Sequence, residues 1–315
     1  MDDGLNGTDL ASLCAFWKIG FRRLSSLHDF LSNVLGQGSA GRWMMVAGAG
    51  VEIQVRPVTD AEIAFFFEHG WVKLPALIDP QCTAILLERA QRTFGVDGRK
   101  GLEQETPATE YWQTWFRSNS DCGRDDYYAA LRTSRELGRN AARLLGRDSS
   151  IRMMMDATMA KLPGHSSKGN GTDFHQDTPG HMYLEANFLT PWIALDKVDQ
   201  DMGAMQFYSG SHKLGNLGQV GALWEEWAPY IERFCTLSEP IALQPGDATV
   251  HANGTIHGTA PNRGQRPRWS WAGVLVPGDA RYTGAQSEYT DGRGMKAYGP
   301  LDHPDFPVIY DPHKQ

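Results

Sequence analysis

The chain has few cysteines, and their spacing excludes two classes of small protein. It holds four cysteines among 315 residues, and no two of them form a CxxC pair. The sequence therefore indicates neither a zinc knuckle nor a disulfide framework. A reducing, cytoplasmic setting is the simplest expectation. The four residues are Cys14, Cys82, Cys122 and Cys235.

Long apolar runs and an excess of positive charge are also lacking. No apolar segment is long enough to cross a bilayer, so no membrane association is expected. The formal net charge of −7 disfavours nucleic acid or an anionic membrane surface as the main partner. Hydrophobic residues make up 41 % and charged residues 21 %, as in ordinary globular proteins. We expect a monomer or homodimer that acts on a small molecule.

The chain is expected to divide into a short extension and one main domain. Residues 1–57 are predicted to form an N-terminal extension that is loosely ordered or peripheral. Acidic residues such as Asp2 and Asp9 argue against a transit peptide. The main domain covers residues 58–315, with a helical part (58–150), a core of strands (151–280) and a C-terminal segment (281–315).

The helical part carries clear start signals. Thr59 and Glu62 match a capping box, so a helix is expected from there to Gly70. Residues 96–125 are polar and irregular. The other elements expected in this part are a strand over Trp71–Leu74, a helix opening at Asp79-Pro80 and a helix over Tyr127–Leu145.

After residue 150 the sequence pattern changes to strands and turns, interrupted over Trp224–Cys235 by a helix or a long insertion. Helices first and about eight strands afterwards indicate a β-sandwich or barrel with flanking helices. The strands are expected over Ile151–Leu162, Asp173–Thr178, Ala186–Leu195, Ala204–Tyr208, Glu239–Leu243, Ala248–His251, Thr255–Gly258 and Arg268–Val276.

The most informative motif is the run Phe174-His175-Gln176-Asp177. In a strand, His175 and Asp177 would point to one face, with Gln176 turned outward. With His257 they give two imidazoles and one carboxylate, the ligand set of a facial triad that holds ferrous iron and leaves positions open. His251 competes with His257, because both flank the hairpin signal Asn253-Gly254. We prefer His257, and we expect His251 to orient a ligand.

Arg268 adds a fixed cation of the kind that grips a carboxylate with two hydrogen bonds. Its neighbours Pro267, Trp269 and Trp271 indicate a partly buried strand, where an unpaired guanidinium would be costly. A buried carboxylate partner is therefore expected. Together with the ligand set, this arginine implies an iron enzyme with a dicarboxylate co-substrate.

Several further motifs occur in a fixed order around these residues. They include Gln244-Pro245-Gly246-Asp247-Ala248 and Ile256-His257-Gly258-Thr259. In this order the chain resembles the phytanoyl-CoA dioxygenase family of iron(II)- and 2-oxoglutarate-dependent oxygenases over roughly residues 58–280. The resemblance implies a double-stranded β-helix, the cupin-like jelly roll, mainly β with flanking helices.

The resemblance also implies residue roles. His175, Asp177 and His257 would bind iron and form the catalytic centre, and Arg268 would bind the distal carboxylate of 2-oxoglutarate. Thr259 is similar to a family hydroxyl residue that helps to hold this carboxylate. Trp192 matches an aromatic residue beside the co-substrate pocket. A family methionine falls at Ala157, which is a departure from the pattern.

The implied cofactors are Fe(II), with 2-oxoglutarate and O2 as co-substrates, giving succinate and CO2. Because Asp177 is present, hydroxylation or desaturation of an unactivated C–H bond is favoured over halogenation. Aromatic residues in the expected mouth of the barrel favour a small, apolar or ring-bearing metabolite. These aromatic residues are Trp112, Trp115, Phe116, Tyr127, Trp224, Trp227 and Tyr230.

Three alternatives stay open at this point. One is an acyl-CoA 2-hydroxylase of the phytanoyl-CoA type, which would need a basic rim. Another is an iron dioxygenase that needs no 2-oxoglutarate. The third is a non-catalytic jelly-roll binding or sensor protein. The candidates for a basic rim are Arg117, Arg124, Arg132, Arg135 and Arg139.

Overall fold

The structure is a computed structural model, and it describes residues 51–100, 116–119, 125–163 and 171–314. The prediction of a peripheral extension falls mostly on residues 1–50, which lie outside the described residues. Of its described remainder, Ile53 is buried in the main hydrophobic core. Within the described residues, none of the helices has both the length and the apolar character needed to traverse a lipid bilayer.

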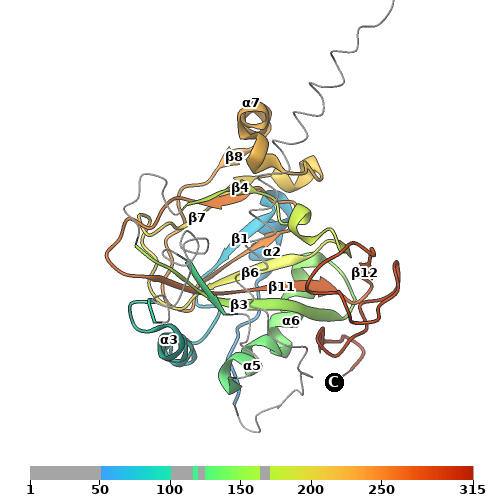
Figure 1. Cartoon of the computed structure of the whole chain (residues 1–315), viewed down its shortest axis with the longest axis horizontal. Coiled ribbons are helices and arrows are strands. Elements are labelled where there is room, and N and C mark those ends of the chain that lie inside the picture. The colour runs from blue at the N-terminus through green and yellow to red at the C-terminus, as the bar shows by residue number, and fades with distance from the viewer. Residues whose placement is uncertain (1–50, 101–115, 120–124, 164–170, 315) are drawn as a thin grey trace, which may run out of the picture. The chain divides into compact units, whose positions relative to one another are not determined.

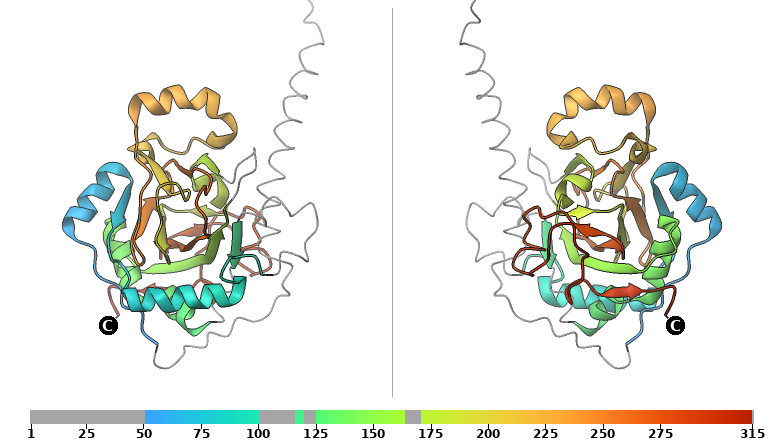
Figure 2. Two further views of the ribbon diagram at one scale, coloured as in Figure 1. Left: turned by 90° about the vertical axis from the view of Figure 1, so that its left-hand side faces the viewer. Right: turned by 90° about the vertical axis from the view of Figure 1, so that its right-hand side faces the viewer.

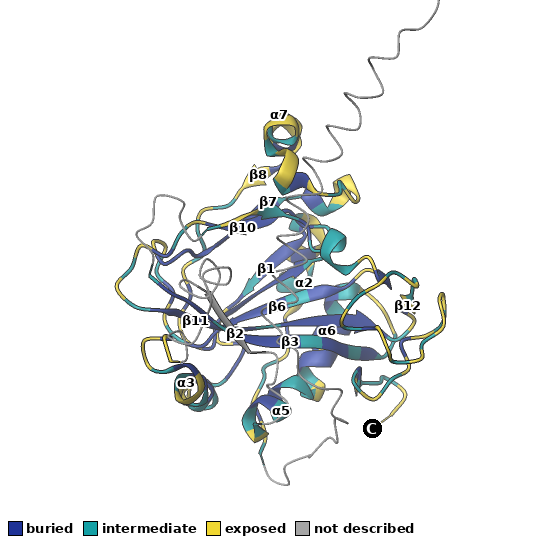
Figure 3. Cartoon of the chain, in the orientation of Figure 1, coloured by how far each residue is buried: buried dark blue, intermediate teal, exposed yellow. Residues whose placement is uncertain are grey.

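The larger of two facing sheets has seven antiparallel strands, and its central strands are long and buried on both faces (Figure 3). β3 is the second-last strand of the main path, and β2 also pairs with it. In spatial order the strands are β1 (Trp71–Leu74), β9 (Ala248–Ala252), β6 (Leu189–Ala194), β11 (Arg268–Pro277), β3 (Ile151–Lys161) and β13 (Val308–Tyr310), with β2 (Phe116–Asn119) off this path.

The smaller sheet has four strands and lies above the larger one in Figure 1. Its order is β4 (Thr172–His175), β10 (His257–Thr259), β7 (Met205–Ser209) and β8 (Thr236–Leu237). A separate pair joins β5 (Leu184–Glu185) to β12 (Arg281–Tyr282). Two facing antiparallel sheets with strands that cross between them are the jelly roll expected from the sequence.

The helices cover the outer faces of the sheets, as the side views also show (Figure 2). Three lie on the side of the large sheet: α3 (Pro80–Phe94), α5 (Asp126–Arg132) and α6 (Arg135–Leu145). α2 (Asp60–His69) leads into β1, and α7 (Trp224–Phe234) lies beyond the small sheet. The described residues also contain the short 3-10 turns η3 (Thr178–His181), η4 (Ser211–Leu214) and η5 (Val220–Leu223).

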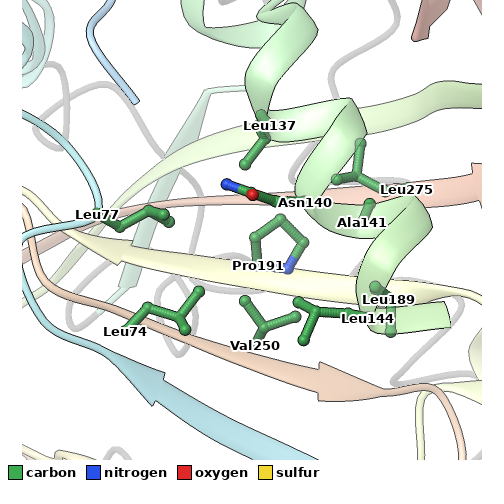
Figure 4. A pocket seen from close by; sticks show the side chains of 10 residues that line it. All are labelled: Leu74, Leu77, Leu137, Asn140, Ala141, Leu144, Leu189, Pro191, Val250 and Leu275. Carbon is green, nitrogen blue, oxygen red and sulfur yellow. The ribbon is translucent and has the colours of Figure 1, made fainter. Parts of the chain in front are cut away.

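The apolar face of α6 packs on the large sheet and closes the main core. Leu137, Ala141 and Leu144 point from the helix toward Leu189 and Val250 of the sheet (Figure 4). Helix and sheet thus bury one face each, which fixes the large sheet as the rigid wall of the site.

The sequence predicted where the helices begin, but the predicted length of one helix was wrong. The capping box of Thr59 and Glu62 is confirmed, and α2 ends at Gly70 in a left-handed conformation. The single helix expected over Tyr127–Leu145 is two helices. Ser134 caps the second helix by accepting a hydrogen bond from the backbone of Leu137, so the chain breaks there.

Three strand predictions need correction. The strand expected over Asp173–Thr178 ends at His175. Glu239–Leu243 is not a strand; only an isolated bridge joins Leu243 to Val198. Asn253-Gly254 does not close a hairpin between paired strands, because β9 and β10 belong to different sheets. This turn carries the chain from one sheet to the other, which brings His251 and His257 together from opposite walls.

Candidate metal centre and co-substrate site

Three side chains converge between the sheets at one end of the small sheet. His175 ends β4 and pairs directly with His257 of β10. Asp177 follows two residues later. The candidate ligand atoms of the three side chains all lie within 4.8 Å of one another. Asp177 Oδ1 is 3.8 Å from His175 Nε2 and 3.6 Å from His257 Nε2.

Asp177 reaches this point by a turn and not by strand alternation. Its backbone is helical (φ −70°, ψ −29°), and it precedes the turn η3. Its N–H donates to the carbonyl oxygen of Asn253 at 3.0 Å, in the crossing between the sheets. The turn therefore depends on the same segment that positions His257.

The expectation that Gln176 points outward is wrong. Its side chain is 2 % exposed and accepts a hydrogen bond from Leu217 N–H. Its amide also donates to the carbonyl oxygens of Gly215 and Gly254, at 2.8 and 2.7 Å. The residue between the two candidate ligands thus ties their turn to two neighbouring loops.

Both imidazoles of the trio are held in the tautomer that suits a metal ligand. His175 Nδ1 lies 2.8 Å from the carbonyl oxygen of Asp173, and His257 Nδ1 lies 2.9 Å from that of Thr255. A carbonyl oxygen can only accept, so each Nδ1 carries the proton. Each Nε2 faces Asp177 Oδ1 and, in the neutral ring, is the atom that carries the lone pair for a metal.

The two carboxylate oxygens of Asp177 have different neighbours. Oδ2 accepts a hydrogen bond from the Thr190 hydroxyl at 2.6 Å and lies 3.2 Å from His251 Nε2. Oδ1 faces the two imidazoles of the trio. Burial would raise the pKa of Asp177, but the neighbouring His257 and the hydrogen bond with His251 outweigh it and hold this pKa well below its usual value.

His251 lies behind the trio, in contact with the carboxylate oxygen that faces away from it. Its ring centroid is 4.0 Å from that of His257. Burial and then the neighbouring His251 and His175 lower the pKa of His257 well below its usual value. The imidazole of His257 is therefore neutral, the form that a metal ligand requires.

Arg268, at the start of β11, is 3 % exposed. Its guanidinium lies over the Trp192 ring, with the central carbon 4.9 Å from the ring centroid, and Nη1 donates to the Gly203 carbonyl oxygen. Its Nε has no hydrogen-bond partner among the described residues. Burial lowers the pKa of Arg268 to about 9. Among the described residues this buried cation contacts a carbonyl oxygen and a tryptophan ring, both neutral, and such a cation favours an anionic ligand.

A second buried cation, missed at the sequence level, lies beside Arg268. Lys161 ends β3, is 1 % exposed and is the direct strand partner of Arg268. Its ammonium donates to the Thr259 hydroxyl and to the Ala260 carbonyl oxygen, the latter at 3.0 Å. A lysine at the end of the apolar run Met-Met-Met-Asp-Ala-Thr-Met-Ala is the signal that could have revealed it.

Gly203 lies beside both cations, Arg268 and Lys161. Its φ of +71° is a conformation that side chains disfavour. A Cβ atom there would come within 2.5 Å of the Ala260 carbonyl oxygen and 3.3 Å of Lys161 Nζ. A glycine therefore lets the chain approach the lysine and present its carbonyl oxygen to Arg268.

The aromatic residues expected at the mouth are divided between different surfaces. Trp224 stacks on Phe174, the neighbour of His175, with centroids 5.1 Å apart. Tyr127 instead lies under Arg89 on the helical side. Trp112 and Trp115 lie outside the described residues, as does the side chain of Phe116. Trp227 and Tyr230 lie on α7, with Tyr230 exposed.

Three of the five arginines considered for a basic rim have partners on the helical side of the protein. Arg132 forms an ion pair with the buried Asp156 at 2.9 Å. Arg135 donates to a carbonyl oxygen near the C-terminus, and Arg139 pairs with Glu136 on the same helix. Arg124 and the side chain of Arg117 lie outside the described residues. Ala157, where the family has a methionine, is buried in β3 opposite Ala272.

Comparison with known proteins agrees with this architecture. A methylphosphonate hydroxylase of Gimesia maris is 25 % identical over 242 residues, which cover 71 % of this chain and 84 % of that protein. The epimerase SnoN in complex with Fe3+, alpha ketoglutarate and nogalamycin RO superposes with a TM-score of 0.62, at 22 % identity over 79 % of this chain and 98 % of that one.

The carbocyclase SnoK from nogalamycin biosynthesis gives a TM-score of 0.60, at 22 % identity over 79 % of this chain and 96 % of that one. The fold is therefore the double-stranded β-helix of the cupin-like 2-oxoglutarate oxygenases, as expected from the sequence.

The sequence model of the family Phytanoyl-CoA dioxygenase (PhyH) matches residues 66–270. The chain belongs to this family. It is a 2-oxoglutarate-dependent dioxygenase, an oxidoreductase that uses Fe(II), 2-oxoglutarate and O2.

The role of Gln176 can be tested by its replacement. Gln176→Leu keeps the volume but leaves two buried carbonyl oxygens and one N–H without a partner. We expect the free energy of unfolding to fall by about 2 kcal/mol or more, measured by urea denaturation. Gln200→Leu is the control, because Gln200 is exposed and donates only to Pro240; it should change stability by less than about 0.5 kcal/mol. Equal effects would contradict the role given to Gln176.

Proposed function

We propose that His175, Asp177 and His257 bind one Fe(II) ion and that the protein hydroxylates an unactivated C–H bond of a small metabolite. Desaturation of the same substrate is the related outcome. The observation that carries this proposal is the convergence of the three ligand atoms within 4.8 Å.

The residues of the trio fit a ferrous ion. Two neutral imidazoles and one ionised carboxylate are the donors of the facial arrangement. The side chain of His175 is 40 % exposed, so solvent reaches the trio at this residue. Bound Fe(II), with 2-oxoglutarate and O2, supplies the oxidation of the C–H bond and releases succinate and CO2.

The chain itself supplies orientation and charge. Thr190 and His251 hold Asp177 Oδ2, so that Oδ1 points toward the imidazoles of His175 and His257. Arg268 would hold the distal carboxylate of 2-oxoglutarate, and the Trp192 ring lies under its guanidinium. Thr259, which is hydrogen-bonded to the strand partner of Arg268, would assist it. A co-substrate held at its far end is aligned with the ion before the reaction starts.

For the substrate we propose a free, small, apolar or ring-bearing metabolite. The stacked pair Phe174 and Trp224 next to His175 supports this class. Hydroxylation is supported by the relative named methylphosphonate hydroxylase. A CoA thioester has less support, because Arg132, Arg135 and Arg139 are engaged on the helical side.

Asp177→Ala tests the metal centre. The variant loses the only carboxylate of the trio, so its affinity for Fe(II) should fall by more than the about 10–100-fold that is typical when a supporting residue is lost. Anaerobic metal titration followed by calorimetry measures this. Asp173→Ala is the matched control, because this exposed carboxylate lies on the same strand outside the trio. Retention of wild-type affinity in Asp177→Ala would exclude the proposed centre.

Arg268→Ala tests the co-substrate site. Loss of the guanidinium should weaken 2-oxoglutarate at least about 100-fold, since hydrogen-bonded charge pairs contribute several kcal/mol, while Fe(II) is retained. The visible charge-transfer band that forms when 2-oxoglutarate is added anaerobically to the Fe(II) protein provides the titration. The control is Arg266→Ala, which removes a more exposed arginine paired with Asp196. An unchanged titration of Arg268→Ala would show that this arginine has another role.

A further inference from the structure

We propose that Lys161 is a positioning residue of the co-substrate site. It fixes the Thr259 hydroxyl as a hydrogen-bond donor and adds a second positive charge to the pocket that receives the distal carboxylate of 2-oxoglutarate. This inference rests on the proposed function. It makes the pocket selective for a 2-oxo acid with a carboxylate at both ends.

The strand register places two cations side by side on the large sheet. Lys161 and Arg268 are direct partners in the antiparallel pair of β3 and β11, so their side chains leave the sheet on the same face. Like charges placed opposite each other in this way are destabilising. Both residues are buried, at 1 % and 3 % exposure, where water screens their repulsion least. An anion bound between them would offset this cost.

The hydrogen bond between Lys161 and Thr259 fixes the direction of the threonine hydroxyl. An ammonium group has donors only, so in its contact with Lys161 the Thr259 hydroxyl must be the acceptor. The single hydroxyl hydrogen of Thr259 is then directed away from the lysine. It is available to a second acceptor, and a carboxylate oxygen is the strongest acceptor that the co-substrate offers there.

Burial disfavours the charged forms of both side chains. Burial lowers the pKa of Lys161 well below its usual value, and the charge of Arg268 lowers it further. Burial also lowers the pKa of Arg268, to about 9. A bound carboxylate favours the charged form of both groups. A carboxylate bound beside both side chains would therefore be attracted by two positive charges.

The geometry at Gly203 agrees with a pocket built around the lysine. Its carbonyl oxygen accepts from Arg268, and the space that its Cβ atom would occupy lies 3.3 Å from Lys161 Nζ. Asn262 also holds the backbone carbonyl oxygen of Lys161, at 2.8 Å. The lysine is therefore fixed at both its backbone and its ammonium group, as a residue that orients another group must be.

The test compares two 2-oxo acids in the Fe(II) protein under anaerobic conditions. One is 2-oxoglutarate, and the other is 2-oxovalerate, which has the same chain length but no distal carboxylate. Lys161→Met should weaken 2-oxoglutarate about 10–100-fold, the range of a hydrogen bond to a charged group, and should leave 2-oxovalerate within about threefold. Isothermal calorimetry measures both affinities.

Thr259→Val, an isosteric change, should reduce the preference for 2-oxoglutarate in the same direction. The double variant should lose less than the product of the two single losses, because both changes remove the same donor. Lys73→Met is the matched control: this lysine lies on β1, donates to the Ala242 carbonyl oxygen and is remote from Thr259 in the sheet order. It should bind both acids as the unaltered protein does.

The possible results distinguish a failure of the role given to Lys161 from a failure of the proposed 2-oxoglutarate site. If Lys161→Met binds both acids normally, or weakens both equally, the role of Lys161 is wrong. If that variant does not fold, an unchanged preference in Thr259→Val overturns the inference equally well. If Arg268→Ala also binds 2-oxoglutarate normally, the proposed co-substrate site itself is wrong. Loss in Arg268→Ala with no change in Lys161→Met would refute only the inference.

Discussion

The arrangement depends on the pairing of β4 with β10, which places His175 opposite His257. One residue of slip would move either imidazole to the other face of the small sheet. The turn after β4 adds the carboxylate, and its anchor is the carbonyl oxygen of Asn253 in the crossing from β9 to β10. Backbone hydrogen bonds of one short segment thus position the candidate ligands.

The two sheets contribute different parts of the site. The small sheet carries the imidazoles and Thr259, whereas the large sheet carries Lys161, Arg268 and Trp192. α6 fixes the large sheet through the main core, so the cations sit on a rigid wall. A co-substrate held by both walls would link them, and binding would stabilise the folded state as any ligand specific to that state does.

Local signals in the sequence predicted the fold well. The capping box at Thr59, the β11 strand and the order of the motifs all agree with the structure, because each is determined within a few residues. The direction of Gln176 and the crossing at Asn253-Gly254 could not be predicted in this way. Their geometry is set by loops distant in sequence, such as residues 215–217, that no local period reveals.

In the site, too, some features could be predicted from the sequence and others could not. The residue types of the trio and Arg268 are visible in the sequence, but the contact of Lys161 with Thr259 depends on how β3 meets β10 across the two sheets. The most direct measurement is a crystal structure of the protein grown anaerobically with Fe(II) and 2-oxoglutarate. The account predicts an anomalous peak bonded to His175 Nε2, Asp177 Oδ1 and His257 Nε2, with the distal carboxylate against Arg268. A peak bonded to other side chains would contradict it.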